Sequence, residues 1–432
     1  MTTPNSSKST MRATRAVDAA TTVEQEKPSL AYRLLSGSWL VSVLAVFVAL
    51  LVGAVLIIMS DSDVQRTATY FFARPTDFFS AAWNAVSGAY LAMLRGSILD
   101  WKATSTVRMI RPLTETLTNS VPLILAGLGV AVGFRAGLFN IGAQGQVILG
   151  AIFGSYVGFA FNLPIGLHLL VAVVAAGIGG ALWAGIAGVL KAKTGANEVI
   201  VTIMLNSIAA LLIAYVLTLS PVIGQGNTNP KSRHVLDSAA YPLLLGAPFR
   251  IHAGFIVALL AAAAVWWLLE RSTLGFEFRA TGMNPEAAQT AGISVAKVTI
   301  LVMLVSGFLC GLAGSAPVLG TERYLTSGVA ASYGFDAITV ALLGKSRPGG
   351  TVLAGLLFGA LNAGGTLMQT ATQTPIDIVL VIQSTIVLFI AAPPLVRAMF
   401  HLPEPGKKSK NKKKRKSRAQ VAEGVARQEA QV

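Results

Sequence analysis

Charged residues, cysteine and clustered histidines are all scarce in this sequence. Only 12% of its 432 residues are Asp, Glu, Lys or Arg, whereas a soluble domain carries about 25%, so an ordinary soluble domain is excluded. The single cysteine, Cys310, excludes an intramolecular disulfide and a thiolate metal cluster. The four histidines are scattered without the spacing of metal ligands. We therefore expect no metal site.

Apolar residues, by contrast, are abundant. They make up 53% of the chain, and the mean hydropathy is +0.65. A membrane-spanning helix needs about 20 apolar residues. The expected fold is all-α, a polytopic membrane protein of about ten transmembrane helices between residues 39 and 398. The ten predicted segments are 39–60, 119–134, 145–161, 165–190, 198–220, 252–270, 298–318, 332–345, 349–369 and 376–398. Several are short, which is typical of the broken helices that form transport sites: 119–134 would span only about 24 Å.

The positive charge is concentrated in one place. The formal net charge is +15, and almost every residue of 407–418 is Lys or Arg. Basic residues beside a membrane segment favour the cytoplasmic side, so both the N-terminal tail (1–38) and the Lys-rich C-terminal tail (399–432) are predicted to be cytoplasmic. The Lys-rich tail suits contact with anionic membrane lipids. Nucleic acid is not an expected partner, because no aromatic residues are interleaved for base stacking.

The long connection at 61–118 is expected outside the cell. It holds six basic residues, but long loops cross the membrane largely regardless of charge. Residues 77–95 and 104–118 are predicted to form interfacial helices within it.

An internal repeat supports an even number of crossings. The segment 179–185 (GGALWAG) resembles 349–355 (GGTVLAG), and each precedes an acidic residue and then an amide in the following segment. These are Glu198 and Asn206 in one copy, and Asp377 and Gln383 in the other. The two copies run in opposite directions in the predicted topology, which indicates two inverted five-helix repeats. Chance similarity is the alternative, since small residues are common in membrane helices.

A polar, glycine-rich break at 137–146 (GLFNIGAQGQ) separates two apolar runs. Backbone that leaves the helix within a bilayer must find hydrogen bonds inside the protein or in a water-filled cavity. We therefore predict that a polar solute passes here, with a substrate pathway formed by Phe139, Asn140, Gln144, Gln146 and Asn206. The alternative for buried amides such as Asn206 is that they tie helices together.

The connection at 270–298 is predicted to contain a short helix. Asn284 can cap it, Pro285 suits its first position, and Glu286 favours its N-terminal dipole. Small residues follow, and Gly292 ends it. Such a helix suits a groove in another protein, whereas an ordinary solvated loop helix is the alternative.

Four ordered strings resemble the permease subunits of bacterial ABC importers, in particular the nucleoside branch related to the ribose and simple-sugar permeases. They are GFRAGLFNIGAQGQ (133–146), NEVIVTIMLNSIA (197–209), TLGFEFRATGMNPEAAQTAGI (273–293) and YGFDAITVALLG (333–344). The resemblance covers about 120–398. Many relatives read FNIGAEGQ in the break, and here Gln144 replaces the acid.

This resemblance implies that 270–298 is a cytoplasmic coupling loop. Its helix would dock on a partner ATPase through Gly282, Asn284, Pro285, Glu286, Ala287, Ala288, Ala291 and Gly292. The implied partners are that cytoplasmic ABC ATPase, a second permease subunit (a homologue or a copy) and an extracellular solute-binding lipoprotein. The implied location is the bacterial plasma membrane.

The chain itself is not expected to be an enzyme or to bind a cofactor. Gly344-Lys345-Ser346 resembles the end of a phosphate-binding loop, but Thr339 stands where that motif requires glycine. ATP and Mg would bind to the partner ATPase.

The predicted function is therefore ATP-driven import of a small neutral polar solute, with a nucleoside expected first and a simple sugar as the alternative. An ion-coupled secondary transporter is a second alternative, although Glu198 and Asp377 lie at segment ends rather than at centres. A membrane scaffold that recruits acidic partners through its Lys-rich tail is a third.

Overall fold

The computed structural model describes residues 38–223 and 229–402. The predicted tails, with the Lys-rich block at 407–418, lie outside the described residues except for their membrane-proximal ends. The chain divides into two compact units, 45–391 and the two terminal parts. The described part of the terminal unit holds the start of α3 and the short helix α18 (Pro393–Met399).

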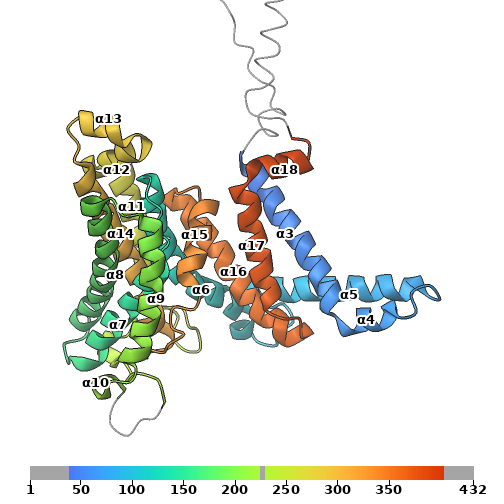
Figure 1. Ribbon diagram of the computed structural model, residues 1–432. Coiled ribbons are helices and arrows are strands. Elements are labelled where there is room, and N and C mark those ends of the chain that lie inside the picture. The colour runs from blue at the N-terminus through green and yellow to red at the C-terminus, as the bar shows by residue number, and fades with distance from the viewer. Residues whose placement is uncertain (1–37, 224–228, 403–432) are drawn as a thin grey trace, which may run out of the picture. The chain divides into compact units, whose positions relative to one another are not determined.

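The described secondary structure is helical, and only isolated β-bridges occur outside the helices. Figure 1 shows the helices of the chain. Their bounds are α3 (Ser38–Ser60), α4 (Ser62–Ala68), α5 (Pro75–Ser97), α6 (Thr106–Arg135), α7 (Ala143–Ala160), α8 (Leu167–Thr194), α9 (Glu198–Val216), α10 (Ser220–Ile223), α11 (Gly254–Arg271), α12 (Thr273–Met283), α13 (Pro285–Thr290), α14 (Val295–Ser315), α15 (Tyr333–Leu343), α16 (Pro348–Thr372) and α17 (Asp377–Ala391), with short 3₁₀ and π segments at Asp237–Ala239 and Ala316–Thr321.

Seven described helices are long and apolar enough to cross a membrane: α3, α6, α8, α9, α11, α14 with its π segment, and α16. Taking α17 together with α18 would give an eighth. The other predicted segments contain α7, which has two glutamines in its first turn, and the 11-residue α15. The protein is thus an all-helical polytopic membrane protein.

The second span begins earlier than predicted. Residues 119–134 are the end of a 30-residue helix, α6, so the prediction of a short segment here is wrong. Residues 104–118 likewise do not form a separate helix. The threonines that precede the predicted start are buried: the Thr114 hydroxyl donates to Arg111 O at 2.7 Å, and the Thr118 hydroxyl to Thr114 O at 2.8 Å. A threonine hydroxyl that donates a hydrogen bond to a carbonyl of its own helix can be buried in a helix bundle without leaving an unpaired polar group.

Close backbone contact holds α7, α8 and α14 together. A Cβ on Gly180 of α8 would lie 2.2 Å from Gly307 O, and one on Gly311 of α14 would lie 2.2 Å from Ala176 O. A Cβ on Gly150 of α7 would lie 2.3 Å from Gly311 O. Small residues let membrane helices approach in this way.

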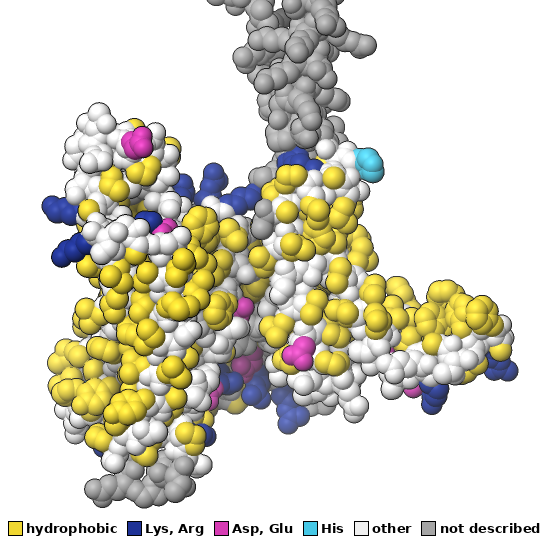
Figure 2. Space-filling model, in the orientation of Figure 1, with side chains coloured by type: hydrophobic (Ala, Val, Ile, Leu, Met, Phe, Trp, Pro, Cys, Tyr) yellow, Lys and Arg dark blue, Asp and Glu magenta, His cyan; other side chains and the backbone are white. Residues whose placement is uncertain are grey.

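The two ends of this bundle differ. In Figure 1, α12 and α13 lie at one end of α8, α9 and α14, and α10 lies at the other. Figure 2 shows hydrophobic side chains over the flank of α8 and α9, whereas Lys and Arg side chains gather near α12 and α13. An apolar flank beside a charged end is the surface expected of a helix bundle in a bilayer.

Candidate functional site

The break between α6 and α7 is held by a closed network of side-chain amides. Asn140 is fully buried. Its Nδ2 donates to Gln146 Oε1 at 2.9 Å and to Ser306 Oγ of α14 at 2.8 Å, and its Oδ1 accepts from Gly142 N at 3.0 Å and Gln146 Nε2 at 2.9 Å. Ser306 in turn donates to Gly129 O of α6 at 2.7 Å. The predicted residues Asn140 and Gln146 are therefore brought together, and both are fully engaged inside the protein.

Asn206 of α9 completes the same network. Its Oδ1 accepts from Gly145 N at 2.8 Å, and its Nδ2 donates to Ile141 O at 2.9 Å. These are backbone groups that the first turn of α7 cannot pair within the helix. Asn206 lies eight residues into α9, about 12 Å from its start. The break is thus well inside the bundle, and Asn206 ties α9 to it.

Gln144 joins this break to a second one. Its Nε2 donates to Ala331 O at 2.7 Å, and its Oε1 accepts from Gly334 N at 2.9 Å, in the first turn of α15. A Cβ on Gly334 would lie 2.2 Å from Gln144 N, so the two backbones touch. The first turns of α7 and α15 therefore meet.

The helix α15 is a half-length helix that starts at this meeting point. Its 11 residues span about 16 Å at 1.5 Å each. The preceding residues 322–332 are not helical, and Arg323 and Ala331 have φ angles of 60° and 38°. Sequence analysis missed this non-helical re-entry, although the shortness of the predicted segment 332–345 was a signal. Transporters use such half-helices to bring backbone dipoles to mid-depth.

Phe139 stands apart from the amide network. Its side chain is 55% exposed, and its ring lies 5.2 Å from that of Phe134. Of the predicted pathway residues, Phe139 is exposed and Gln144 partly exposed, whereas Asn140, Gln146 and Asn206 are buried.

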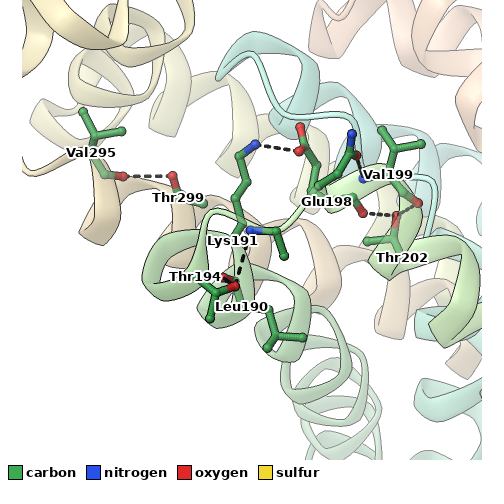
Figure 3. A network of polar contacts seen from close by, with 10 residues as sticks. Leu190, Lys191, Thr194, Glu198, Val199, Thr202, Val295 and Thr299 are labelled. Carbon is green, nitrogen blue, oxygen red and sulfur yellow. Dashed lines mark hydrogen bonds and ion pairs between the residues drawn. The ribbon is translucent and has the colours of Figure 1, made fainter.

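An ion pair closes the turn between α8 and α9. Figure 3 shows Lys191, near the end of α8, pointing to Glu198 at the start of α9, with 2.5 Å between Nζ and Oε2. The pair complements both helix dipoles, since a cation suits the end of a helix and an anion its start. Glu198 therefore has a structural role here, which counts against a coupling acid.

The predicted short helix is present as α13. Asn284 Oδ1 accepts from Ala287 N at 3.0 Å, Pro285 occupies the first position, and Gly292 has a φ of 88°. Glu286, Ala287 and Ala291 are exposed, as are Asn284, Pro285 and Gly292, whereas Ala288 is buried against the protein. The exposed surface of α13 is therefore narrower than the alanine pattern suggested.

Gly282, just before α13, contacts the first break directly. A Cβ on Gly282 would lie 2.5 Å from Arg135 O, and one on Gly137 would lie 3.2 Å from Gly282 Cα. Gly137 has a φ of 72°, which glycine adopts without strain. The 270–298 connection thus packs on the residues that lead into the amide network.

A further polar cluster lies at the end opposite α13, and no sequence motif singled out its members. Arg250 is within 3.6 Å of both Glu115 and Glu322. The buried His252 ring stacks on Tyr241 at 5.2 Å. Burial and the nearby Arg250 lower the pKa of His252 to about 4. The ring is therefore neutral at pH 7, and its Nδ1 accepts from Gly254 N at 3.2 Å.

A family model described as the permease component of a branched-chain amino acid transport system matches residues 113–391. The chain belongs to this permease family.

Three relatives illustrate the range of the family. The permease is 37% identical to the guanosine ABC transporter permease protein NupP of Bacillus subtilis, over 83% of its own length and 94% of the relative. It is 37% identical to a glucose ABC transporter permease protein of Haloferax volcanii, over 76% and 90% of the two chains. A second guanosine permease protein of Bacillus subtilis, NupQ, is 28% identical over 60% and 84%. No solved structure matches the chain.

Proposed function

We propose that this permease imports a nucleoside as one membrane subunit of an ABC importer. The single observation that carries the proposal is the meeting of two broken helices at Gln144, which offers amide and backbone groups instead of charges. Such groups suit an uncharged solute rich in hydrogen-bonding groups. The guanosine relatives favour a nucleoside. The glucose relative supports a simple sugar as the second candidate.

The topology we propose has ten passages, with both termini cytoplasmic and residues 61–105 outside. Two inverted five-helix repeats would consist of α3, α6, α7, α8 and α9, followed by α11, α14, α15, α16 and α17. Three correspondences support them. The third member of each half is the helix that starts at a break, the fourth carries the GG motif, and the fifth opens with an acid. The Lys-rich tail would then lie against anionic lipids of the inner leaflet.

The partners we propose are a cytoplasmic ATPase, which binds ATP and Mg, a second permease subunit and an extracellular solute-binding lipoprotein. Two guanosine permease proteins in one Bacillus subtilis strain support a pair of different permeases. The exposed residues of α13 would dock on the ATPase, so its displacement would switch the broken helices between outward-open and inward-open states. Phe139 and Gln144 would contact the solute, and Asn140, Gln146 and Asn206 would hold the path in shape.

Uptake of radiolabelled guanosine and glucose by cells with and without the gene tests the substrate. We expect guanosine uptake to depend on the gene, to survive an ionophore and to stop when ATP is depleted. Uptake that stops with the ionophore but survives ATP depletion would favour an ion-coupled carrier, and gene-dependent glucose uptake would favour the sugar.

The glycine that ends α13 provides a test of the coupling loop. Gly292→Trp should abolish uptake and ATPase co-purification while the protein stays in the membrane, because a bulky side chain would stand beside the docking helix. Gly195→Trp is the matched control: Gly195 also has open space and a positive φ of 72°, at the end of α8. Normal uptake by the Gly292 variant would remove the assignment of α13.

A further inference from the structure

The guanidinium of Arg135, the last residue of α6, binds two different parts of the protein. Its Nη2 lies 3.1 Å from Glu270 Oε1, at the end of α11, and its Nε donates to Ser346 O, just after α15, at 3.0 Å. The partners are 135 and 211 residues away in the sequence. One side chain therefore links the coupling-loop end of the protein to the end of the half-length helix α15.

The coupling-loop side of this link is stiff. Arg279 of α12 donates to Leu269 O and lies 3.1 Å from the other oxygen of Glu270. A Cβ on Gly275 of α12 would lie 1.9 Å from Leu268 O, so α11 and α12 touch along their backbones. Asn284 both ends α12 and caps α13. A displacement of α13 would therefore carry α12 and the end of α11 with it.

The other side of the link holds both broken helices. Arg135 ends α6, and the next residues lead into the amide network of the first break. Ser346 follows α15, and both it and Lys345 have positive φ angles, 51° and 54°. Successive left-handed residues other than glycine store strain and persist where their surroundings hold them, often in switch regions. The Arg135 bond to the Ser346 carbonyl is one such restraint.

We propose that Arg135 is a positioning residue that transmits the displacement of α12–α13 to both broken helices at once. The proposal rests on the proposed function, in which α13 docks on the ATPase. A guanidinium is suited to the task because its fixed fork can hold two acceptors in set directions, whereas a lysine ammonium is a flexible point charge.

The ion pair between Arg135 and Glu270 is expected to contribute little to the folding stability of the protein. The side chains of Arg135 and Glu270 are 28% and 40% exposed, and ion pairs at such sites usually add little to stability. Variants of Arg135 should therefore fold and assemble, which allows transmission to be tested separately.

Accessibility of Phe139 provides the direct measurement. The native cysteine is fully buried, so Phe139→Cys introduces a single reactive thiol at the first break. In the complete transporter, reconstituted with its ATPase, partner permease and binding protein, trapping with ATP and vanadate should change maleimide labelling of this thiol severalfold. Adding Arg135→Gln should abolish that change and lower guanosine uptake about tenfold, the size of a typical coupling between sites, while ATP hydrolysis continues.

Two matched variants sharpen the result. Arg135→Lys keeps the charge but not the fork, so we expect it to behave like Arg135→Gln. Arg271→Gln removes a neighbouring cation, one whose guanidinium lies over Trp266, and it should leave the nucleotide-dependent labelling intact. Full nucleotide-dependent labelling in the Arg135→Gln protein, or an equal loss in Arg271→Gln, would overturn the proposal. Failure of the proposed function looks different, because the ATPase would then co-purify normally with the Gly292→Trp protein.

Discussion

The two breaks, 136–142 before α7 and 322–332 before α15, solve the same problem in different ways. Backbone outside a helix needs hydrogen-bond partners within the membrane. In the first break several of these partners are side-chain amides: Asn140 Oδ1 accepts from Gly142 N, and Asn206 Nδ2 donates to Ile141 O. In the second they are largely backbone groups: Leu325 O accepts from Ser232 N at 2.9 Å. Side-chain pairing leaves a pattern in the sequence, whereas backbone pairing to a distant loop does not.

The largest effect on stability and uptake is expected from a substitution where the two breaks contact each other. Gly334→Ala should destabilise the protein by about 3 kcal/mol and abolish uptake, because its Cβ would lie 2.2 Å from Gln144 N and no side chain can yield there. Thermal unfolding in detergent and guanosine uptake measure the effect. Gly328→Ala in the same region is the control, since its Cβ would meet open space. Equal behaviour of the two variants would contradict direct contact between the breaks.

The amide network should be the next most sensitive feature. Asn140→Ala removes four hydrogen bonds and leaves buried partners unpaired, at a cost of about 2 kcal/mol. The midpoint of thermal unfolding should fall accordingly. Asn362→Ala, which breaks one bond to Gln383 between α16 and α17, should lower it less. The reverse order would show that the first break is not held by its amides.

Substitutions of Gln144 test whether its side chain acts through its hydrogen bonds or only fills the space between the two breaks. Gln144→Leu loses both bonds to the second break, and the expected cost is about 1 kcal/mol with severalfold slower uptake. Gln144→Glu keeps the acceptor for Gly334 N but sets a carboxylate against the Ala331 carbonyl, so we expect an intermediate rate. Uptake at the wild-type rate by the leucine variant would show that transport does not depend on the Gln144 amide.

The smallest effect is expected at the Lys191–Glu198 pair, at the edge of the first break. Glu198→Gln should cost less than about 1 kcal/mol, because Lys191 is partly exposed and such pairs add little. Uptake should stay near the wild-type rate. Loss of uptake by a stable Glu198→Gln protein would revive the ion-coupled carrier.

Local patterns predicted most of the helices. Each of the ten predicted segments contains a helix, because a long apolar run has few alternatives in a bilayer. The short helix α13 was predicted from Asn284, Pro285 and Gly292, which act on their immediate neighbours. The predicted start of α6 was wrong because the buried hydroxyls of Thr114 and Thr118 pair with their own helix and that of Thr116 pairs with Ser97 O of α5, which a hydropathy pattern does not register.

Local sequence patterns indicate an all-helical membrane permease with an amide-rich break and a capped short helix in the 270–298 connection. No local pattern indicates that the first turns of α7 and α15 meet at Gln144, that Ala288 is buried, or that Arg135 joins Glu270 to Ser346. The physical reason is distance along the chain. Apolar runs and helix caps act over a few residues, whereas these contacts join residues more than a hundred positions apart, and no local pattern specifies which partner a side chain will meet.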